Sequence, residues 1–199
     1  MSKNMVLASH NAKKAAELKS IVEPLGYAIL TLADFPGAPE PEETGTTFEE
    51  NAAIKAVSAF EFTGLPSLAD DSGLEVDALG GEPGVYSARF AGVGADDEAN
   101  NALLLQRLGA LPMEKRTARF VSVVALAMAG NKTVLFRGEC EGTILFAQQG
   151  VGGFGYDPLF LSTDLKKTFA QASGEEKNGV SHRGRALAKL AAAMPGMAW

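Results

Sequence analysis

Apolar positions along the chain alternate between the spacing of strands and the spacing of helices. Residues 5–8 form a short apolar run typical of a buried strand, and residues 18–25 repeat apolar positions at helical spacing until Gly26. A second strand is predicted over residues 27–32. Because strand, helix and strand follow one another, the pattern favours an α/β fold.

The middle of the chain carries local start and stop signals. Thr47 and Glu50 have the spacing of a capping box, which predicts a helix from this point to Gly64. After it, apolar residues flank Asp70-Asp-Ser-Gly73, and we expect a strand, a sharp turn and another strand there. A further helix is predicted from Asp96 to Leu108.

The second half of the chain introduces antiparallel pairing. The runs 120–128 and 133–136 flank Gly130-Asn131, a two-residue hairpin signal, and a helix is expected from about Ser181 to the end. We therefore expect an α/β fold with a mixed central β-sheet flanked by helices, and two lobes with a substrate cleft between them. The chain has no visible linker, so residues 1–199 are expected to act as a single domain.

Composition narrows the class of protein. Apolar residues make up 46% and charged residues 21% of the 199, as in globular proteins. With neither a spanning apolar run nor a secretory apolar core, we expect a cytoplasmic protein without membrane contact. The single cysteine, Cys140, excludes an internal disulfide, and the net charge of −6 argues against a nucleic-acid partner.

Two segments have the chemistry of a phosphate and metal site. Ser9-His-Asn-Ala-Lys-Lys14 lies where the first strand meets the first helix, a position that attracts anions, although Ser9 or Asn11 could simply cap the helix. Neighbouring strand residues point to opposite faces, so one of Asp70 and Asp71 is expected to enter a site and hold Mg²⁺. A second metal ligand could come from the acidic loop containing Glu40, Glu42 and Glu43, which could equally be solvated surface.

A glycine-rich segment satisfies G-x-G-x-x-G between Gly150 and Gly155. Since Tyr156-Asp157-Pro158 predicts a turn after it rather than a helix, we exclude a dinucleotide-binding fingerprint. Phe154 could stack on a nucleobase or pack as a core residue. His182 lies beside Arg183 at the start of the last helix, which indicates contact with an anion.

Six blocks, taken in order, resemble those of the dITP/XTP pyrophosphatases, also called inosine triphosphate pyrophosphatases. These blocks cover nearly the whole chain and are Ser9–Lys14, Glu42–Lys55, Ala69–Gly81, Pro83–Phe90, Gly153–Pro158 and Glu176–Gly184. His10 and Lys13 stand where the opening motif of this family often has glycines.

The resemblance implies hydrolysis of non-standard purine nucleoside triphosphates (dITP, ITP and XTP) to the monophosphate and pyrophosphate. It also implies a requirement for Mg²⁺, a two-lobed α/β fold and a homodimer. Asp71 is the implied catalytic residue, and Glu42 with Asp71 the implied metal ligands, with Glu43 as the alternative to Glu42. The implied substrate-binding residues are Ser9, His10, Asn11, Ala12, Lys13, Lys14, Lys55, Ser72, Phe154, Gly155, Tyr156, Asp157, Lys177, His182 and Arg183.

Three other functions remain open at this point. A related pyrophosphatase could act on pyrimidine or modified nucleotides, and assays with dUTP and dTTP would separate the two. A nucleotide sensor would bind without turnover, although Lys14, Lys55 and Asp71 together argue against it. A nucleic-acid-binding module is disfavoured by the acidic charge balance.

Overall fold

The fold is taken from a computed structural model, which describes residues 3–9 and 12–197. The chain forms two compact units, each assembled from separate segments. Unit 1 contains Met1–Asp71, Val123–Arg137 and Ala186–Trp199, and unit 2 contains Ser72–Ser122 and Gly138–Arg185.

A six-stranded sheet has the order β2-β1-β3-β4-β5-β6. Its strands are β1 (Lys3–Leu7), β2 (Tyr27–Thr31), β3 (Ser67–Val76), β4 (Thr117–Met128), β5 (Lys132–Ile144) and β6 (Phe160–Ser162). β1 pairs in parallel with β2 and with β3, whereas β5 and β6 are antiparallel. The predicted α/β fold with a mixed sheet is confirmed.

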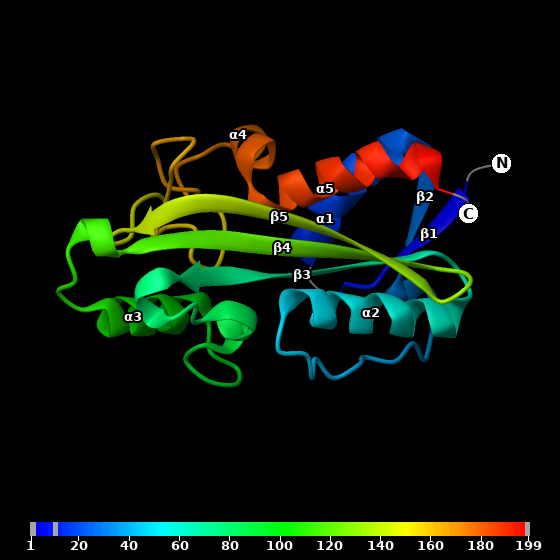
Figure 1. Ribbon diagram of the computed structural model, residues 1–199, viewed down its shortest axis with the longest axis horizontal. Helices are drawn as coiled ribbons and strands as arrows, with labels where there is room; N and C mark the ends of the chain where they lie inside the picture. Colours follow the sequence, from blue (N-terminus) through cyan, green and yellow to red (C-terminus); the bar gives the residue numbers. More distant parts are fainter. Residues whose placement is uncertain (1–2, 10–11, 198–199) are drawn as a thin grey trace. The chain divides into compact units, whose positions relative to one another are not determined.

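Unit 1 packs helices on both faces of its part of the sheet. They are α1 (Ala12–Val22), α2 (Phe48–Thr63) and most of α5 (His182–Ala193), and Figure 1 shows α2 on the face opposite α1 and α5. Leu18 of α1 and Leu187 of α5 are buried in one cluster with Leu126 of β4. Burial of each of these leucines stabilises unit 1 by about 1.5–3 kcal/mol.

Unit 2 contains α3 (Asp97–Leu108), α4 (Gly174–Val180) and an aromatic core. The ring of Phe120 stacks on Phe169, with centroids 5.7 Å apart, and is tilted against Phe160 at 4.6 Å. Short 3₁₀ helices complete the chain: η1 (Glu23–Leu25), η2 (Leu32–Asp34), η3 (Asp77–Leu79), η4 (Gly84–Arg89), η5 (Met113–Lys115) and η6 (Met194–Gly196). In the described part of the chain, no helix is long and apolar enough to cross a membrane.

Local sequence signals are confirmed at two places. The Thr47 side chain accepts a hydrogen bond from the Glu50 amide, and the Glu50 carboxylate accepts one from the Thr47 amide, so the capping box starts α2. Gly130 and Asn131 have φ values of 77° and 55°, as the tight turn between β4 and β5 requires.

The sharp turn predicted at Asp70–Gly73 is wrong. β3 continues through this segment, and Gly73 is absent from the glycines with positive φ. Leu68, Ala69, Leu74 and Val76 are all buried, so both halves of the strand bury apolar side chains and extended pairing is favoured over a turn.

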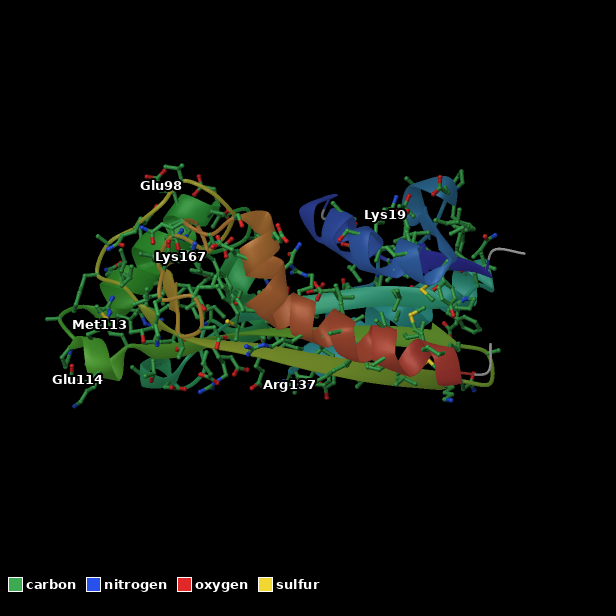
Figure 2. The ribbon with its side chains drawn as sticks, turned by 90° about the horizontal axis from the view of Figure 1, so that it is seen from above. Lys19, Glu98, Met113, Glu114, Arg137 and Lys167 are labelled. Atoms are coloured by element: carbon green, nitrogen blue, oxygen red, sulfur yellow. The ribbon has the colours of Figure 1, made fainter. Side chains whose placement is uncertain are left out.

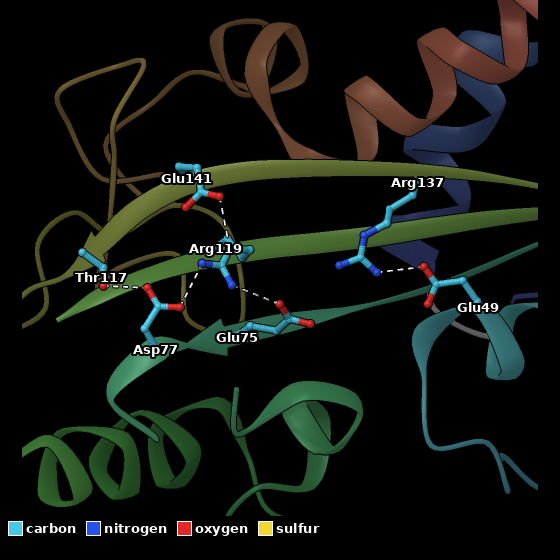
Figure 3. Close-up of polar contacts among 7 residues, drawn as sticks. All are labelled: Glu49, Glu75, Asp77, Thr117, Arg119, Arg137 and Glu141. Atoms are coloured by element: carbon cyan, nitrogen blue, oxygen red, sulfur yellow. Dashed lines mark hydrogen bonds and ion pairs between the residues drawn. The ribbon is translucent and has the colours of Figure 1, made fainter. Parts of the chain in front are cut away.

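Charged side chains join three strands on one face of the sheet in unit 2 (Figure 3). Arg119 of β4 contacts Glu75 of β3 at 3.4 Å, Asp77 of η3 at 2.9 Å and Glu141 of β5 at 3.1 Å. Burial alone would lower the pKa of Arg119, but the hydrogen bond and charge of Glu141 and the charge of Asp77 raise it. The network therefore links side chains of β3, β4 and β5 across this face of the sheet.

Candidate functional site

An acidic cluster in unit 1 is organised around one lysine. Lys55 of α2 donates to Asp71 of β3 at 3.0 Å and to Glu43, in the loop before α2, at 2.8 Å. Burial would lower the pKa of the Lys55 ammonium, but the charge of Asp71 and the hydrogen bond to Glu43 raise it. Two carboxylates thus lie close together around one cation, and Asp71 is 6% exposed.

The register of the parallel strands explains why Asp71 is available for chemistry. β1 pairs with β3 only as far as Leu7 opposite Leu68, and the Ala8 amide donates to the Leu68 carbonyl at 2.7 Å. β3 continues beyond this point to Asp71. The chain after β1 therefore leads Ser9 and the start of α1 towards the same region of unit 1, where ligands commonly bind in parallel sheets.

Part of the predicted phosphate segment is not covered by the structure. His10 and Asn11 lie outside the described residues, and for Ala12, Lys13 and Lys14 only the helical backbone of α1 is described. Ser9 is half-buried.

Ser9 also lines a cavity of about 440 Å³. The cavity lies at the carboxyl ends of β1 and β2, and its other lining residues include Ala16 and Lys19 of α1 and Thr31 of β2. Figure 2 labels Lys19 on α1, at the cavity that it helps to line.

The loop before α2 is positioned by Asn51, a residue whose role we did not predict. Its Oδ1 accepts the Gly45 amide at 2.8 Å, and Asn51 is fully buried. Asn51 and Lys55 are four residues apart, so they share one face of α2. The loop is thereby held with Glu43, rather than Glu42, at Lys55; Glu42 is exposed and its side chain has no partner in the described parts of the chain.

The donor set around Asp71 fits Mg²⁺. Magnesium binds oxygen atoms and uses one or two carboxylates, with water and phosphate oxygens completing its octahedron. Asp71 and the Glu42-Glu43 pair supply carboxylate oxygens in this region. No group of three or more histidine, cysteine or carboxylate side chains that could hold a metal ion is found in residues 3–9 and 12–197.

A second group of predicted residues meets in unit 2. The buried ammonium of Lys177 in α4 contacts the Asp157 carboxylate at 2.6 Å and lies 4.7 Å from the centre of the Phe154 ring. The same carboxylate accepts the Phe154 amide at 3.0 Å. At Gly153, with φ 76°, a Cβ would collide with Asp157, so the glycine is required for this contact.

Three further predicted residues of unit 2, Tyr156, His182 and Arg183, are buried. The His182 ring stacks on Phe120 at 4.9 Å, and Arg183, 2% exposed, donates to Ser72 at 3.1 Å. The Tyr156 hydroxyl donates to the Ser87 carbonyl at 2.9 Å, and burial, with a smaller effect of the Asp97 charge, raises its pKa. Tyr156 therefore acts as a support for the loop rather than as a proton donor.

The glycine-rich loop contains no nucleotide-binding helix. Residues 154–159 form turns that lead into β6, so the exclusion of a dinucleotide fingerprint is confirmed. Phe154 is half-buried, with its ring accessible in part and its amide fixed by Asp157. An aromatic face next to an ammonium is suited to bind a purine that presents acceptor atoms.

Known proteins match nearly the whole length of this chain. The profile of the Ham1 family matches residues 5–193. A dITP/XTP pyrophosphatase from an Exiguobacterium species is 55% identical over 188 residues, covering 94% of this chain and 95% of that protein. The enzyme of the same name from Geobacter sulfurreducens is 54% identical over 186 residues, with 94% of both chains covered.

Solved structures show the same fold. The Staphylococcus aureus Ham1 protein superposes with a TM-score of 0.90 at 42% identity, covering 98% of this chain and 99% of that one. A nucleoside-triphosphatase, dITP/XTP pyrophosphatase, from Mycobacterium abscessus has a TM-score of 0.80 at 48% identity, covering 94% and 98%. With a family profile spanning almost its full length and relatives above 50% identity, this chain belongs to the Ham1 family.

Proposed function

We propose that the protein hydrolyses dITP, ITP and XTP to the nucleoside monophosphate and pyrophosphate, with residues 1–199 acting as one Mg²⁺-dependent pyrophosphatase domain. The observation that carries the proposal is the cluster in which Lys55 joins Asp71 and Glu43. The names of the relatives support the substrate class.

In the proposed reaction, a water oxygen attacks the α-phosphorus, and the bond from this phosphorus to the α–β bridging oxygen breaks. The Asp71 carboxylate accepts the proton of the water, and pyrophosphate leaves with the bonding electron pair. Lys55, together with Ser9, His10, Asn11, Ala12, Lys13 and Lys14, binds the phosphates and stabilises the growing negative charge. No covalent nucleophile is required.

Asp71 and a glutamate of the Glu42-Glu43 pair would hold the magnesium ion. When bound, Mg²⁺ supplies positive charge to the phosphate oxygens and orients them. We propose Glu42 as the second ligand from the family resemblance, with Glu43, which Lys55 engages together with Asp71, as the alternative. If Glu42 is the ligand, Glu42→Gln raises the Mg²⁺ concentration needed for half-maximal activity more than Glu43→Gln does.

Purine recognition is assigned to Ser72 and the residues of the second group, including Gly155 and Tyr156. Phe154 would stack on the base, while Lys177, His182 and Arg183 present donors to its edge. A 6-keto oxygen accepts such a hydrogen bond, whereas adenine places an amino donor there. Leaving two buried donors facing each other is costly, so ATP should be a poor substrate.

The decisive assay is pyrophosphate release from dITP, ITP, XTP, ATP, dUTP and dTTP, with and without Mg²⁺. Asp71→Asn should lower kcat for ITP by about a hundredfold or more, the size of a lost general base. Circular dichroism controls for folding. An Asp71→Asn enzyme with nearly full activity, or a wild-type protein that prefers pyrimidine nucleotides, would refute the proposal.

We also propose that the enzyme works in the cytoplasm on the free nucleotide pool and forms a homodimer. Sedimentation at micromolar concentration tests the second statement, and a mass of one chain at all concentrations would contradict it.

A further inference from the structure

Two side chains of α3 hold the backbone of one residue of the glycine-rich loop, Gly155. The Asp97 carboxylate accepts the Gly155 amide at 2.6 Å, and the Asn101 side-chain amide donates to the Gly155 carbonyl at 2.9 Å. Asp97 and Asn101 are four residues apart and therefore lie on one face of the helix. Gly155 is thus fixed through both its amide and its carbonyl.

The start of α3, which carries Asp97, is stabilised by a side-chain cap. The Asp96 side chain accepts the Ala99 amide at 2.8 Å and caps the helix. Asp97 is exposed at the start of the helix, next to Glu98, whose position on the surface is labelled in Figure 2. Asn101 is buried, one turn further along.

Gly155 lies directly between the parts of the loop that are assigned to the base. Phe154 precedes it, and Asp157, the partner of Lys177, follows two residues later. Gly155 has φ 59°, and the space where a Cβ would stand is open, so no side chain of its own packs there. The two side chains of α3 hold its amide and its carbonyl instead.

The Asn101 side chain uses only part of its capacity for hydrogen bonds. Its Oδ1 is buried and has no hydrogen-bond partner within residues 3–9 and 12–197. A buried unpaired acceptor destabilises a fold. The bond to Gly155 is therefore the only one that this side chain makes in the described structure.

We propose that Asp97 and Asn101 are positioning residues for purine recognition, acting through the backbone amide and carbonyl of Gly155. The inference rests on the proposed function, because it assumes that Phe154 and Lys177 contact the base. It extends the specificity site to a helix that contributes no residue to the proposed contacts with substrate. Loss of either bond should loosen the Phe154 ring and weaken base binding, while phosphate binding in unit 1 stays unchanged.

The neighbouring Asn100 offers a matched control. It is equally buried, at 3% exposure, but its Oδ1 accepts the Ala91 amide at 2.8 Å and its Nδ2 donates to the Ala88 carbonyl at 3.3 Å. Asn100→Leu therefore removes two bonds to a different segment. Asn101→Leu removes the hydrogen bond to the Gly155 carbonyl and also the unpaired Oδ1. The leucine side chain is similar in size to asparagine.

The experiment measures binding of inosine monophosphate and of pyrophosphate by calorimetry, together with the Tm. Asn101→Leu should keep its Tm and bind inosine monophosphate about tenfold more weakly, the size of one lost hydrogen bond. Asn100→Leu should show the opposite result, a lower Tm and unchanged affinity. Pyrophosphate affinity should be the same in all three proteins, and KM for ITP should rise in Asn101→Leu with little change in kcat.

Asp97 provides a second test, since its exposed side chain can be changed without risk to the core. Asp97→Asn retains an acceptor oxygen and should bind inosine monophosphate as the wild type does, whereas Asp97→Ala should bind it more weakly. If Asn101→Leu and Asp97→Ala both bind inosine monophosphate with wild-type affinity, the positioning role is refuted. The proposed function still stands in that case, provided that the wild type releases pyrophosphate from ITP. A wild type that neither binds inosine monophosphate nor turns over ITP overturns the proposed function as well.

Discussion

Removing the ammonium of Lys177 should destabilise the protein strongly, because its partner Asp157 would keep a buried charge. The side chains of this pair are 10% and 3% exposed, so solvent screens their interaction little. Breaking a buried pair by removing one member costs about 3–5 kcal/mol. In the variant, Asp157 still accepts the hydrogen bond from the Phe154 amide. We therefore expect Lys177→Met to lower the free energy of unfolding by an amount near the lower end of this range, about 3 kcal/mol.

For a chain of this length, about 3 kcal/mol corresponds to a fall in Tm of roughly 6–12 °C. Calorimetry or urea unfolding followed by circular dichroism measures it. The double variant Lys177→Met/Asp157→Asn also removes the unpaired charge of Asp157. It should therefore regain a large part of the Tm that Lys177→Met loses.

The control is Lys167→Met, which breaks an ion pair with Glu176 of the same 2.6 Å length but 34% and 45% exposed. Its Tm should hardly change, because solvent screens exposed pairs. Equal losses in the two single variants, or no recovery in the double variant, would refute the assignment of stability to burial of the Lys177–Asp157 pair.

Three further outcomes follow from the same structure. The hydrogen bond from Lys167, helped by the Ser173 amide, lowers the pKa of Glu176 to about 2. Carboxyl NMR should show Glu176 titrating well below the ordinary range of glutamate, while stability changes little across that titration because solvent screens this exposed pair. Burial raises the pKa of the Cys140 thiol, so a thiol reagent at pH 8 should label it far more slowly in the native protein than in urea. Gly153→Ala should lower both the Tm and the affinity for inosine monophosphate, since its methyl group collides with Asp157; an unchanged value of either would contradict this.

Local signals made several elements predictable. The capping box at Thr47 and Glu50 and the Gly130-Asn131 turn depend on a few neighbouring residues, and both form as expected. The prediction for Asp70–Gly73 is wrong because the conformation of this segment does not depend on its neighbouring residues alone. Its polar residues and glycine are typical of turns, but pairing in the sheet and the burial of both flanks decide its conformation. Sequence alone does not show that pairing.

The chemistry of the site was also predictable only in part. Charged and aromatic residues in ordered blocks indicated Asp71, Lys55, Phe154 and Lys177, and the structure brings them together in pairs. Which glutamate reaches Lys55 depends on the course of a loop of irregular backbone. The contacts of Asn101 with Gly155 span 54 positions along the chain, and no local pattern signals such a contact.

The way the two units are assembled from the chain affects synthesis and truncation. Unit 1 requires Ala186–Trp199, which are translated after the whole of unit 2. A nascent chain released from the ribosome before that point would expose the apolar surface that Leu187 and Leu190 otherwise cover. Neither unit can be obtained as a contiguous fragment, so limited deletion from the carboxyl end should yield aggregated protein rather than a smaller folded one.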